Sequence, residues 1–172
     1  MKRILTITAI LGALFATPAM AQESNAGTAY VSVGAGAYDV NDDETAADFR
    51  LEYRSGTSLF WQIRPWGGAE VTSDGSVWAG GGILADIGVT PEFYIIPSFG
   101  AGFYDEGSSD KDLDYWLEFR SQIELAYQFD NQHRLGLALS HISNAGLGDD
   151  NPGTEILNLY WHIPTNSLLN GF

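Results

Sequence analysis

The chain of 172 residues contains no cysteine, and only 8 of its residues are lysine or arginine. The absence of cysteine excludes a disulfide scaffold, a thiolate metal site and a cysteine nucleophile. With 22 acidic residues, the formal net charge is −14. So few basic side chains could not neutralise the phosphates of a nucleic acid, which argues against nucleic acid as a partner.

Disorder is also excluded, because 45% of the residues are hydrophobic and 13% are aromatic. A chain of this length is expected to form one domain. No long uninterrupted apolar run follows the first twenty residues.

The N-terminal residues have the three parts of a secretory signal peptide. Met1, Lys2 and Arg3 form a short basic segment, residues 4–15 are almost wholly apolar, and Ala19-Met20-Ala21 fits the cleavage pattern. An anchor helix is the less favoured interpretation, because the run is shorter than the ~20 apolar residues that span a bilayer. The sequence therefore predicts a signal peptide at 1–21 and a mature domain at 22–172, exported to a bacterial envelope.

Beyond the signal, apolar and polar side chains alternate with a period of two, which is typical of strands. In residues 115–129, Phe119 and Ile123 lie on one face, and Arg120 and Glu124 lie on the other. A helix would place the charges all round its surface. We expect eight strands, at Thr28–Val40, Ala47–Ser55, Ser58–Gly67, Ser76–Asp86, Pro91–Tyr104, Asp114–Phe129, His133–Asn144 and Thr154–Pro164.

The connections between these strands alternate in length. Short turns are expected at 55–57, 87–90 and 130–132, and longer polar loops at 41–45, 68–75, 105–113 and 145–153. This layout is typical of bacterial outer-membrane barrels. In hydrocarbon every backbone polar group must be paired, so a sheet that crosses a membrane must close. The predicted fold is an all-β, eight-stranded antiparallel transmembrane β-barrel.

Alternation alone does not say which face is inside, so a soluble lipocalin-like barrel with an apolar interior stays open. Export without cysteine, the loop asymmetry and five tryptophans that could anchor at the interface favour the membrane version. These are Trp61, Trp66, Trp78, Trp116 and Trp161. An interior polar network would then fill the narrow barrel, built from Arg50, Glu52, Arg54, Glu118, Arg120, Gln122 and Glu124.

Three polar residues interrupt the apolar faces of the last two expected strands. His141 and Ser143 follow Leu135, Leu137 and Leu139 on one face, and Glu155 precedes Leu157 and Leu159 on the other strand. A charged group on a lipid face is costly, so the cluster suggests chemistry. With His141 opposite Glu155, a Ser-His-Glu arrangement is plausible, in which Ser143 attacks, His141 accepts its proton and Glu155 orients the imidazole. Polar residues solvated at the rim are the alternative.

The segment His141-Ile142-Ser143-Asn144-Ala145-Gly146, followed by Asn151-Pro152-Gly153 and Glu155, resembles the active-site hairpin of the PagL-type outer-membrane lipid A 3-O-deacylases, a family also labelled acyloxyacyl hydrolases. The resemblance is strong over about thirty residues, from Leu135 to Ile163. It implies a lipid-facing triad with Ser143 as nucleophile, His141 as base and Glu155 as orienting acid. It also implies an oxyanion region at Asn144, Ala145, Gly146 and Asn151.

The resemblance further implies ester hydrolysis without a metal or cofactor, on lipid A of lipopolysaccharide in the external leaflet of the outer membrane. Which ester position is cleaved stays open, and so does a homodimer. A non-enzymatic structural or adhesive barrel is the main alternative function. The acidic residues Asp105, Glu106, Asp110, Asp112 and Asp114 crowd one loop. A solvated loop is favoured there over a calcium site, because the spacing fits no calcium motif.

Overall fold

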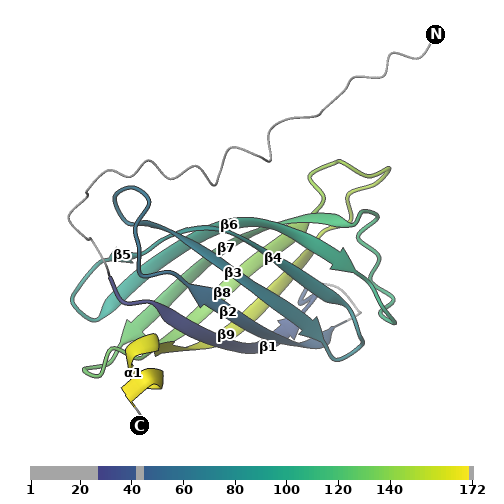
Figure 1. Ribbon diagram of the computed structural model, residues 1–172. Helices are drawn as coiled ribbons and strands as arrows, with labels where there is room; N and C mark the ends of the chain where they lie inside the picture. The colour runs from purple at the N-terminus through teal and green to yellow at the C-terminus, as the bar shows by residue number, and fades with distance from the viewer. Residues whose placement is uncertain (1–26, 42–44, 171–172) are drawn as a thin grey trace.

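The computed structural model describes residues 27–41 and 45–170, so the predicted signal peptide lies outside the described residues (Figure 1). The strands are β1 (Tyr30–Tyr38), β2 (Ala46–Arg54), β3 (Ile63–Thr72), β4 (Val77–Ala85), β5 (Ile87–Gly88), β6 (Phe93–Asp105), β7 (Leu117–Gln128), β8 (Arg134–Ser143) and β9 (Thr154–Pro164). A short helix, α1 (Thr165–Asn170), follows β9. Among the described residues, no helix is long and apolar enough to cross a membrane.

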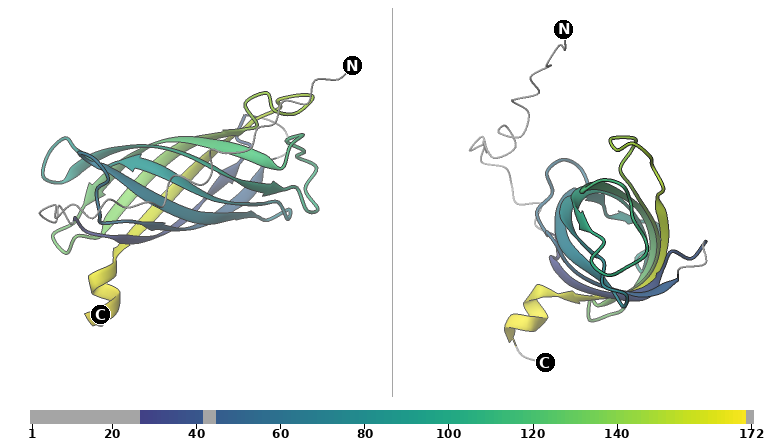
Figure 2. Two further views of the ribbon diagram at one scale, coloured as in Figure 1. Left: turned by 45° about the horizontal axis from the view of Figure 1, so that its top comes forward. Right: turned by 90° about the vertical axis from the view of Figure 1, so that its right-hand side faces the viewer.

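Eight long strands form one closed antiparallel sheet. Each pairs with its neighbours in sequence, and β1 closes the ring by pairing with β9. The two-residue β5 adds only a short pairing to β6, and β4 pairs directly with β6. Figure 2 shows the ring end-on. The predicted eight-stranded antiparallel barrel is confirmed, and closure leaves no long strand with an unpaired edge.

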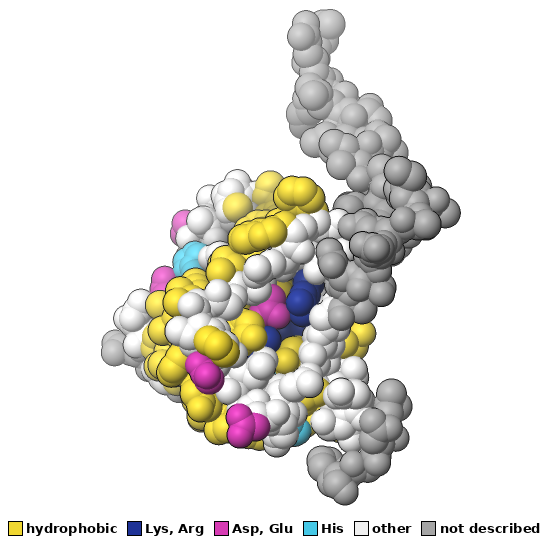
Figure 3. All heavy atoms as spheres, turned by 90° about the vertical axis from the view of Figure 1, so that its left-hand side faces the viewer, with side chains coloured by type: hydrophobic (Ala, Val, Ile, Leu, Met, Phe, Trp, Pro, Cys, Tyr) yellow, Lys and Arg dark blue, Asp and Glu magenta, His cyan; other side chains and the backbone are white. Residues whose placement is uncertain are grey.

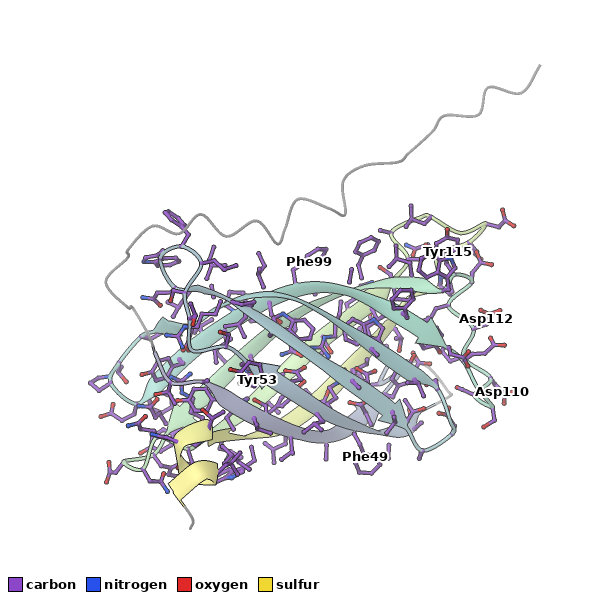
Figure 4. The ribbon with its side chains drawn as sticks, in the orientation of Figure 1. Phe49, Tyr53, Phe99, Asp110, Asp112 and Tyr115 are labelled. Atoms are coloured by element: carbon purple, nitrogen blue, oxygen red, sulfur yellow. The ribbon has the colours of Figure 1, made fainter. Side chains whose placement is uncertain are left out.

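The apolar face of the barrel points outward. Along β2, Phe49, Leu51 and Tyr53 are each more than half exposed, whereas Arg50 and Glu52 are buried. Figure 4 shows Phe49, Tyr53 and Phe99 projecting from the wall, and Figure 3 shows basic and acidic side chains inside the hollow end. The soluble alternative with an apolar interior is therefore wrong, and an apolar outer surface suits a bilayer.

Most of the interior charges form the predicted network, but both carboxylate oxygens of the buried Glu118 lack a hydrogen-bond partner among the described residues. Arg50 Nε lies 2.9 Å from Asp48 Oδ2 and 2.8 Å from Glu70 Oε2. Arg54 Nη2 lies 3.0 Å from Glu52 Oε2 and 2.9 Å from Glu124 Oε2. Each buried arginine thus has carboxylate partners, as buried charges require.

Glu52 lies at the centre of this network. Its Oε1 also accepts hydrogen bonds from Arg120 and, at 3.0 Å, from the hydroxyl of Tyr160. All seven side chains predicted for the interior are buried, and they fill the barrel as expected for this strand number.

For two of the five tryptophans, the predicted position at the membrane interface is wrong. Trp66 and Trp78 are buried inside the barrel, where their rings stack with centroids 6.0 Å apart. The guanidinium of Arg120 lies 4.3 Å and 4.9 Å from the two ring centroids, a cation–π arrangement that holds them inside. Trp61, Trp116 and Trp161 are exposed and fit the predicted role.

The predicted bounds of the third strand are also wrong. It was expected at Ser58–Gly67 but runs from Ile63 to Thr72. Gly68, predicted to begin the loop at 68–75, instead pairs with Glu52 of β2, next to the pair of Gly67 with Tyr53. A Cβ added at Gly68 would lie 2.5 Å from the carbonyl oxygen of Leu51, so glycine permits a close approach of two strands rather than a turn. The β2–β3 connection is consequently longer than expected, and the β3–β4 connection shorter.

The two ends of the barrel differ. The connections at 106–116 and 144–153 extend from the end that we call the loop end, on the right in Figure 1. The connections at 55–62, 86–92 and 129–133 lie at the opposite end, the turn end, together with α1. His141 and Glu155 lie near the loop end, close to the start of the β8–β9 connection.

Candidate active site

His141 and Glu155 face each other across the β8–β9 pair. They are direct partners in the sheet register, as predicted, and His141 Nδ1 lies 3.0 Å from Glu155 Oε1. The two side chains are 45% and 37% exposed on the outer wall. A pair this exposed contributes only ~0–1 kcal/mol to stability. Its effect is instead to fix the orientation of the imidazole ring, with Nδ1 toward Glu155.

The other imidazole nitrogen faces Gly153, at the end of the hairpin that carries Ser143. A Cβ added at Gly153 would lie 2.7 Å from His141 Cε1 and 3.2 Å from Nε2. The register that pairs His141 with Glu155, continued by two residues, places Gly153 opposite Ser143. The Nε2 edge of the ring therefore faces the end of the hairpin where Ser143 lies.

No hydrogen bond joins Ser143 to His141 within the described ranges. The serine hydroxyl is half-buried, lies two residues from His141 on the same face of β8, and has no acceptor there. Hydrogen bonds between catalytic groups are often long before substrate binds, so this geometry is compatible with a nucleophile and its base.

Gly153 should be sensitive to a single added methyl group. Its φ of 42° lies in the left-handed region, and a side chain there would press on the imidazole. We expect Gly153→Ala to lower ester hydrolysis by about 100-fold, because displacing a catalytic group by about 1 Å has that effect. Gly146→Ala is the matched control, since Gly146 has a similar φ of 77° but no atom within 4 Å of an added Cβ. Equal losses in both variants would show that backbone strain, not the imidazole, is responsible.

A second serine faces His141 from the other side. Ser121 on β7 is the register partner of His141 and is exposed on the outer wall. Directly opposed side chains have Cβ atoms about 4.5–5.5 Å apart. The period of two puts Ser121 on the same face as Phe119 and Ile123, but it does not reveal the position of Ser121 opposite His141. The register of β7 against β8, unlike the hairpin of β8 and β9, is not set by a motif.

Asn144, one of the predicted oxyanion residues, forms the hydrogen bonds that fix the β8–β9 loop. The Asn144 Nδ2 group donates to the carbonyl oxygens of Leu113 at 3.0 Å and Asp150 at 2.8 Å, and Oδ1 accepts from the Gly146 N–H at 2.7 Å. Asn144 is fully buried. These contacts occupy both the Asn144 amide and the Gly146 N–H.

The backbone N–H of Ala145 has no acceptor in the part of the chain that the structure describes. Ala145 adopts a left-handed φ of 54°, directly after the buried Asn144. Asn151 is exposed, and its backbone N–H donates to Asp150 Oδ1 at 2.8 Å. The N–H of Ala145 and the side-chain amide of Asn151 are therefore donors of this region without an acceptor among the described residues, and either is available for an oxyanion.

The β6–β7 loop is hydrogen-bonded to the β8–β9 loop. Asp114 Oδ2 accepts the N–H of Asp150 at 2.7 Å, and the same oxygen packs closely against Gly148. Farther along, the buried Asp39 accepts from Thr154 Oγ1 at 2.9 Å and pairs with Lys111 Nζ at 2.9 Å. Because Thr154 precedes Glu155, these contacts fix the start of β9, where the predicted orienting acid lies.

The acidic loop residues are engaged in local turns rather than gathered round a cation. Asp105 Oδ1 accepts the N–H of Gly107 at 2.9 Å, and Asp112 Oδ1 accepts the N–H of Asp114 at 2.7 Å. Among the described residues, no group of three or more His, Cys, Asp or Glu side chains could hold a metal ion. The other histidines lie apart from the site, since His162 is buried in the barrel beside Glu124 and His133 is at the turn end.

An open groove adjoins the site on the outer wall. It has a volume of about 480 Å³ and is lined by His141, Glu155, Ser121, Ile123 and Leu139, among others. Ile123 and Leu139 are register partners between β7 and β8 and lie farther from the loop end than His141. The groove is therefore polar beside His141 and apolar toward the middle of the barrel.

Comparisons with known proteins agree with this architecture. The family model described as Lipid A 3-O-deacylase (PagL) matches residues 47–164. The Lipid A deacylase PagL of Bordetella bronchiseptica (strain ATCC BAA-588 / NCTC 13252 / RB50) is 36% identical over 89 residues, which cover 51% of this chain and 50% of that protein. The chain thus spans about half the length of that curated relative.

Two solved structures have the same fold. The crystal structure of the outer membrane enzyme PagL matches with a TM-score of 0.61 at 21% identity, over 78% of this chain and 99% of that one. A de novo designed transmembrane β-barrel matches with a TM-score of 0.52 at 14% identity, over 84% and 100%. Since the family model spans most of the barrel, the chain belongs to the lipid A 3-O-deacylase (PagL) family.

Proposed function

We propose that this protein is an outer-membrane esterase that removes the acyl chain from the glucosamine 3-position of lipid A. The observation that carries the proposal is the His141–Glu155 pair, held at 3.0 Å on the apolar outer wall with Ser143 on the Nε2 side of the ring. Membership of the PagL family and the likeness to Lipid A deacylase PagL support the substrate.

In the proposed reaction, Ser143 Oγ attacks the carbonyl carbon of the ester while His141 Nε2 accepts the hydroxyl proton. Glu155 accepts a hydrogen bond from Nδ1–H and stabilises the imidazolium that forms. The Ala145 N–H stabilises the negative charge on the carbonyl oxygen. Collapse of the intermediate breaks the bond to the sugar oxygen, which takes the proton from His141. Water then hydrolyses the acyl-Ser143 ester by the same steps and releases the fatty acid.

The position of the groove explains how a water-insoluble substrate could reach His141 and Glu155. A lipid in the external leaflet could bring its ester to His141 while its acyl chain stays beside Ile123 and Leu139. The chain need not leave hydrocarbon, and the barrel interior, filled by the arginine network, has no part in binding. One chain carries all three residues, so the reaction requires no second copy.

Covalent labelling tests the nucleophile directly. A long-chain alkyl fluorophosphonate, incubated with the protein in detergent, should attach to Ser143 and to no other serine, as read by peptide mass spectrometry. Ser121 also faces His141 and is the internal comparison. Labelling of Ser121 would assign the nucleophile to the opposite strand, and absence of labelling on both would contradict the serine mechanism.

Removing the charge of Glu155 should be nearly as damaging as removing the nucleophile. Glu155→Gln keeps the size of the side chain but no longer stabilises the imidazolium. In serine hydrolases such a change lowers the rate by about 10⁴-fold, so we expect a loss of about 10³–10⁴-fold in fatty-acid release from lipid A micelles. The conservative variant Glu155→Asp should recover part of the activity. Unchanged turnover in Glu155→Gln would show that the His141–Glu155 contact is only structural.

A further inference from the structure

Among the described residues, no arginine is placed to meet a phosphate at the loop end. Of the 8 lysines and arginines, Lys2 and Arg3 lie outside the described residues. The five arginines at positions 50, 54, 64, 120 and 134 all project into the barrel, where carboxylates pair with them. Lys111 is at the loop end, but its ammonium is bound to Asp39, with 11% of its side chain exposed.

The two long loops at the loop end carry exposed carboxylates instead. Figure 4 shows Asp110 and Asp112 projecting at the loop end of the barrel. Asp149 and Asp150 lie in the β8–β9 loop itself, between Ser143 and Glu155. The complete set of exposed acids on these two loops is Asp105, Glu106, Asp110, Asp112, Asp114, Asp149 and Asp150.

This distribution opposes a polyanionic headgroup. A phosphate within a Debye length of a carboxylate, about 10 Å at 0.1 M salt, is repelled. Binding of lipid A by its phosphates would require arginine or lysine side chains in reach, because these are the groups that pair with phosphate. Here the exposed side chains of the two loops carry negative charge, which repels phosphate.

We propose that the preferred substrates are lipid A molecules of low negative charge, whose phosphates are absent or capped by neutral or cationic groups. This inference rests on the deacylase function proposed above and specifies its substrate class. The groove and the triad would select the acyl ester, and the acidic loops would select against phosphate on the sugar.

The test compares lipid A with both phosphates to lipid A from which they have been removed, in neutral detergent micelles. EDTA removes divalent cations that would mask the phosphates, and the ionic strength is kept low. We expect the dephosphorylated substrate to be hydrolysed about five-fold or more faster, as several weak repulsions within a Debye length imply. At 0.5 M NaCl the difference should shrink to below about two-fold, since screening shortens the Debye length.

Charge-reversal variants locate the effect. Asp149→Lys should raise turnover of the phosphorylated substrate several-fold and leave the dephosphorylated substrate little changed. Asp149 is exposed and makes no contact that the site needs. Asp130→Lys introduces the same charge at the turn end and should change neither rate.

The outcomes separate this inference from the function on which it rests. Equal rates at low salt, or faster hydrolysis of the phosphorylated substrate, would overturn the charge preference while leaving the esterase in place. A preference that salt does not alter would also overturn it, because shape and not charge would be its cause. Hydrolysis of neither substrate would instead contradict the proposed function.

Discussion

Ser143→Ala should lower the rate of fatty-acid release from lipid A by at least about a thousand-fold, the loss seen when a serine nucleophile is removed. The reason is that the Nε2 edge of His141 faces Gly153, at the end of the hairpin that carries Ser143. The rate would be measured with purified protein in micelles, using a substrate that the wild type hydrolyses.

Ser121→Ala provides the contrast, because Ser121 is the other hydroxyl beside the imidazole. We expect a loss of no more than about ten-fold there, from a small change in how the substrate is positioned. If Ser121→Ala lost the activity and Ser143→Ala kept it, the assignment of the nucleophile would be reversed. Both variants should keep the heat-dependent gel mobility of a closed barrel, since neither residue is part of the interior network.

The second large effect concerns stability. Glu52→Ala removes a carboxylate that contacts Arg54 at 3.0 Å, Tyr160 at 3.0 Å and Arg120. Its removal leaves buried guanidinium groups with fewer partners, a change that costs about 3–5 kcal/mol. We therefore expect the free energy of unfolding to fall by that amount, measured by reversible urea unfolding in lipid vesicles.

The exposed residue Asp130 at the turn end is the matched control for that measurement. Asp130→Ala removes a carboxylate that is not part of the network, so it should change the free energy of unfolding by less than about 0.5 kcal/mol. A similarly small effect of Glu52→Ala would mean that the outward apolar surface alone stabilises the barrel.

Most of the fold could be predicted because alternation is a local signal. The last strand was expected at Thr154–Pro164 and lies there. Side chains two residues apart share a face, so Arg50, Glu52 and Arg54 could be assigned together once one of them was placed inside. The register with His141 opposite Glu155 was one that closes the β8–β9 hairpin, and the structure has this pairing.

The errors arose where one residue type serves two purposes. The pair Gly67-Gly68 carries the usual signal of a loop, yet Gly68 here lets β3 approach β2 closely. Trp66 and Trp78 suit a membrane interface equally well by composition, and their burial beside Arg120 shows that they are interior. Composition alone makes neither distinction.

Contacts between distant loops likewise could not be predicted from the sequence. The hydrogen bond from Asn144 to Leu113 and the one from Asp150 to Asp114 join segments far apart in the chain. These hydrogen bonds turn the Asn144 side chain inward, whereas the Ala145 N–H has no acceptor among the described residues. The sequence placed both residues in one oxyanion region and did not show that Asn144 holds the loop while the Ala145 N–H stays available.

The central claim is that this barrel hydrolyses the 3-linked acyl ester of lipid A by means of Ser143. The most direct test is mass spectrometry of lipid A from cells that express the wild-type protein or, separately, Ser143→Ala. Since the preferred headgroup charge is proposed to be low, the host should make lipid A with capped or absent phosphates. The account predicts loss of one 3-hydroxyacyl chain, assigned by fragmentation to the 3-position, with the wild type only. Loss of a secondary, non-hydroxylated chain, or unchanged lipid A with the protein folded in the outer membrane, would contradict it.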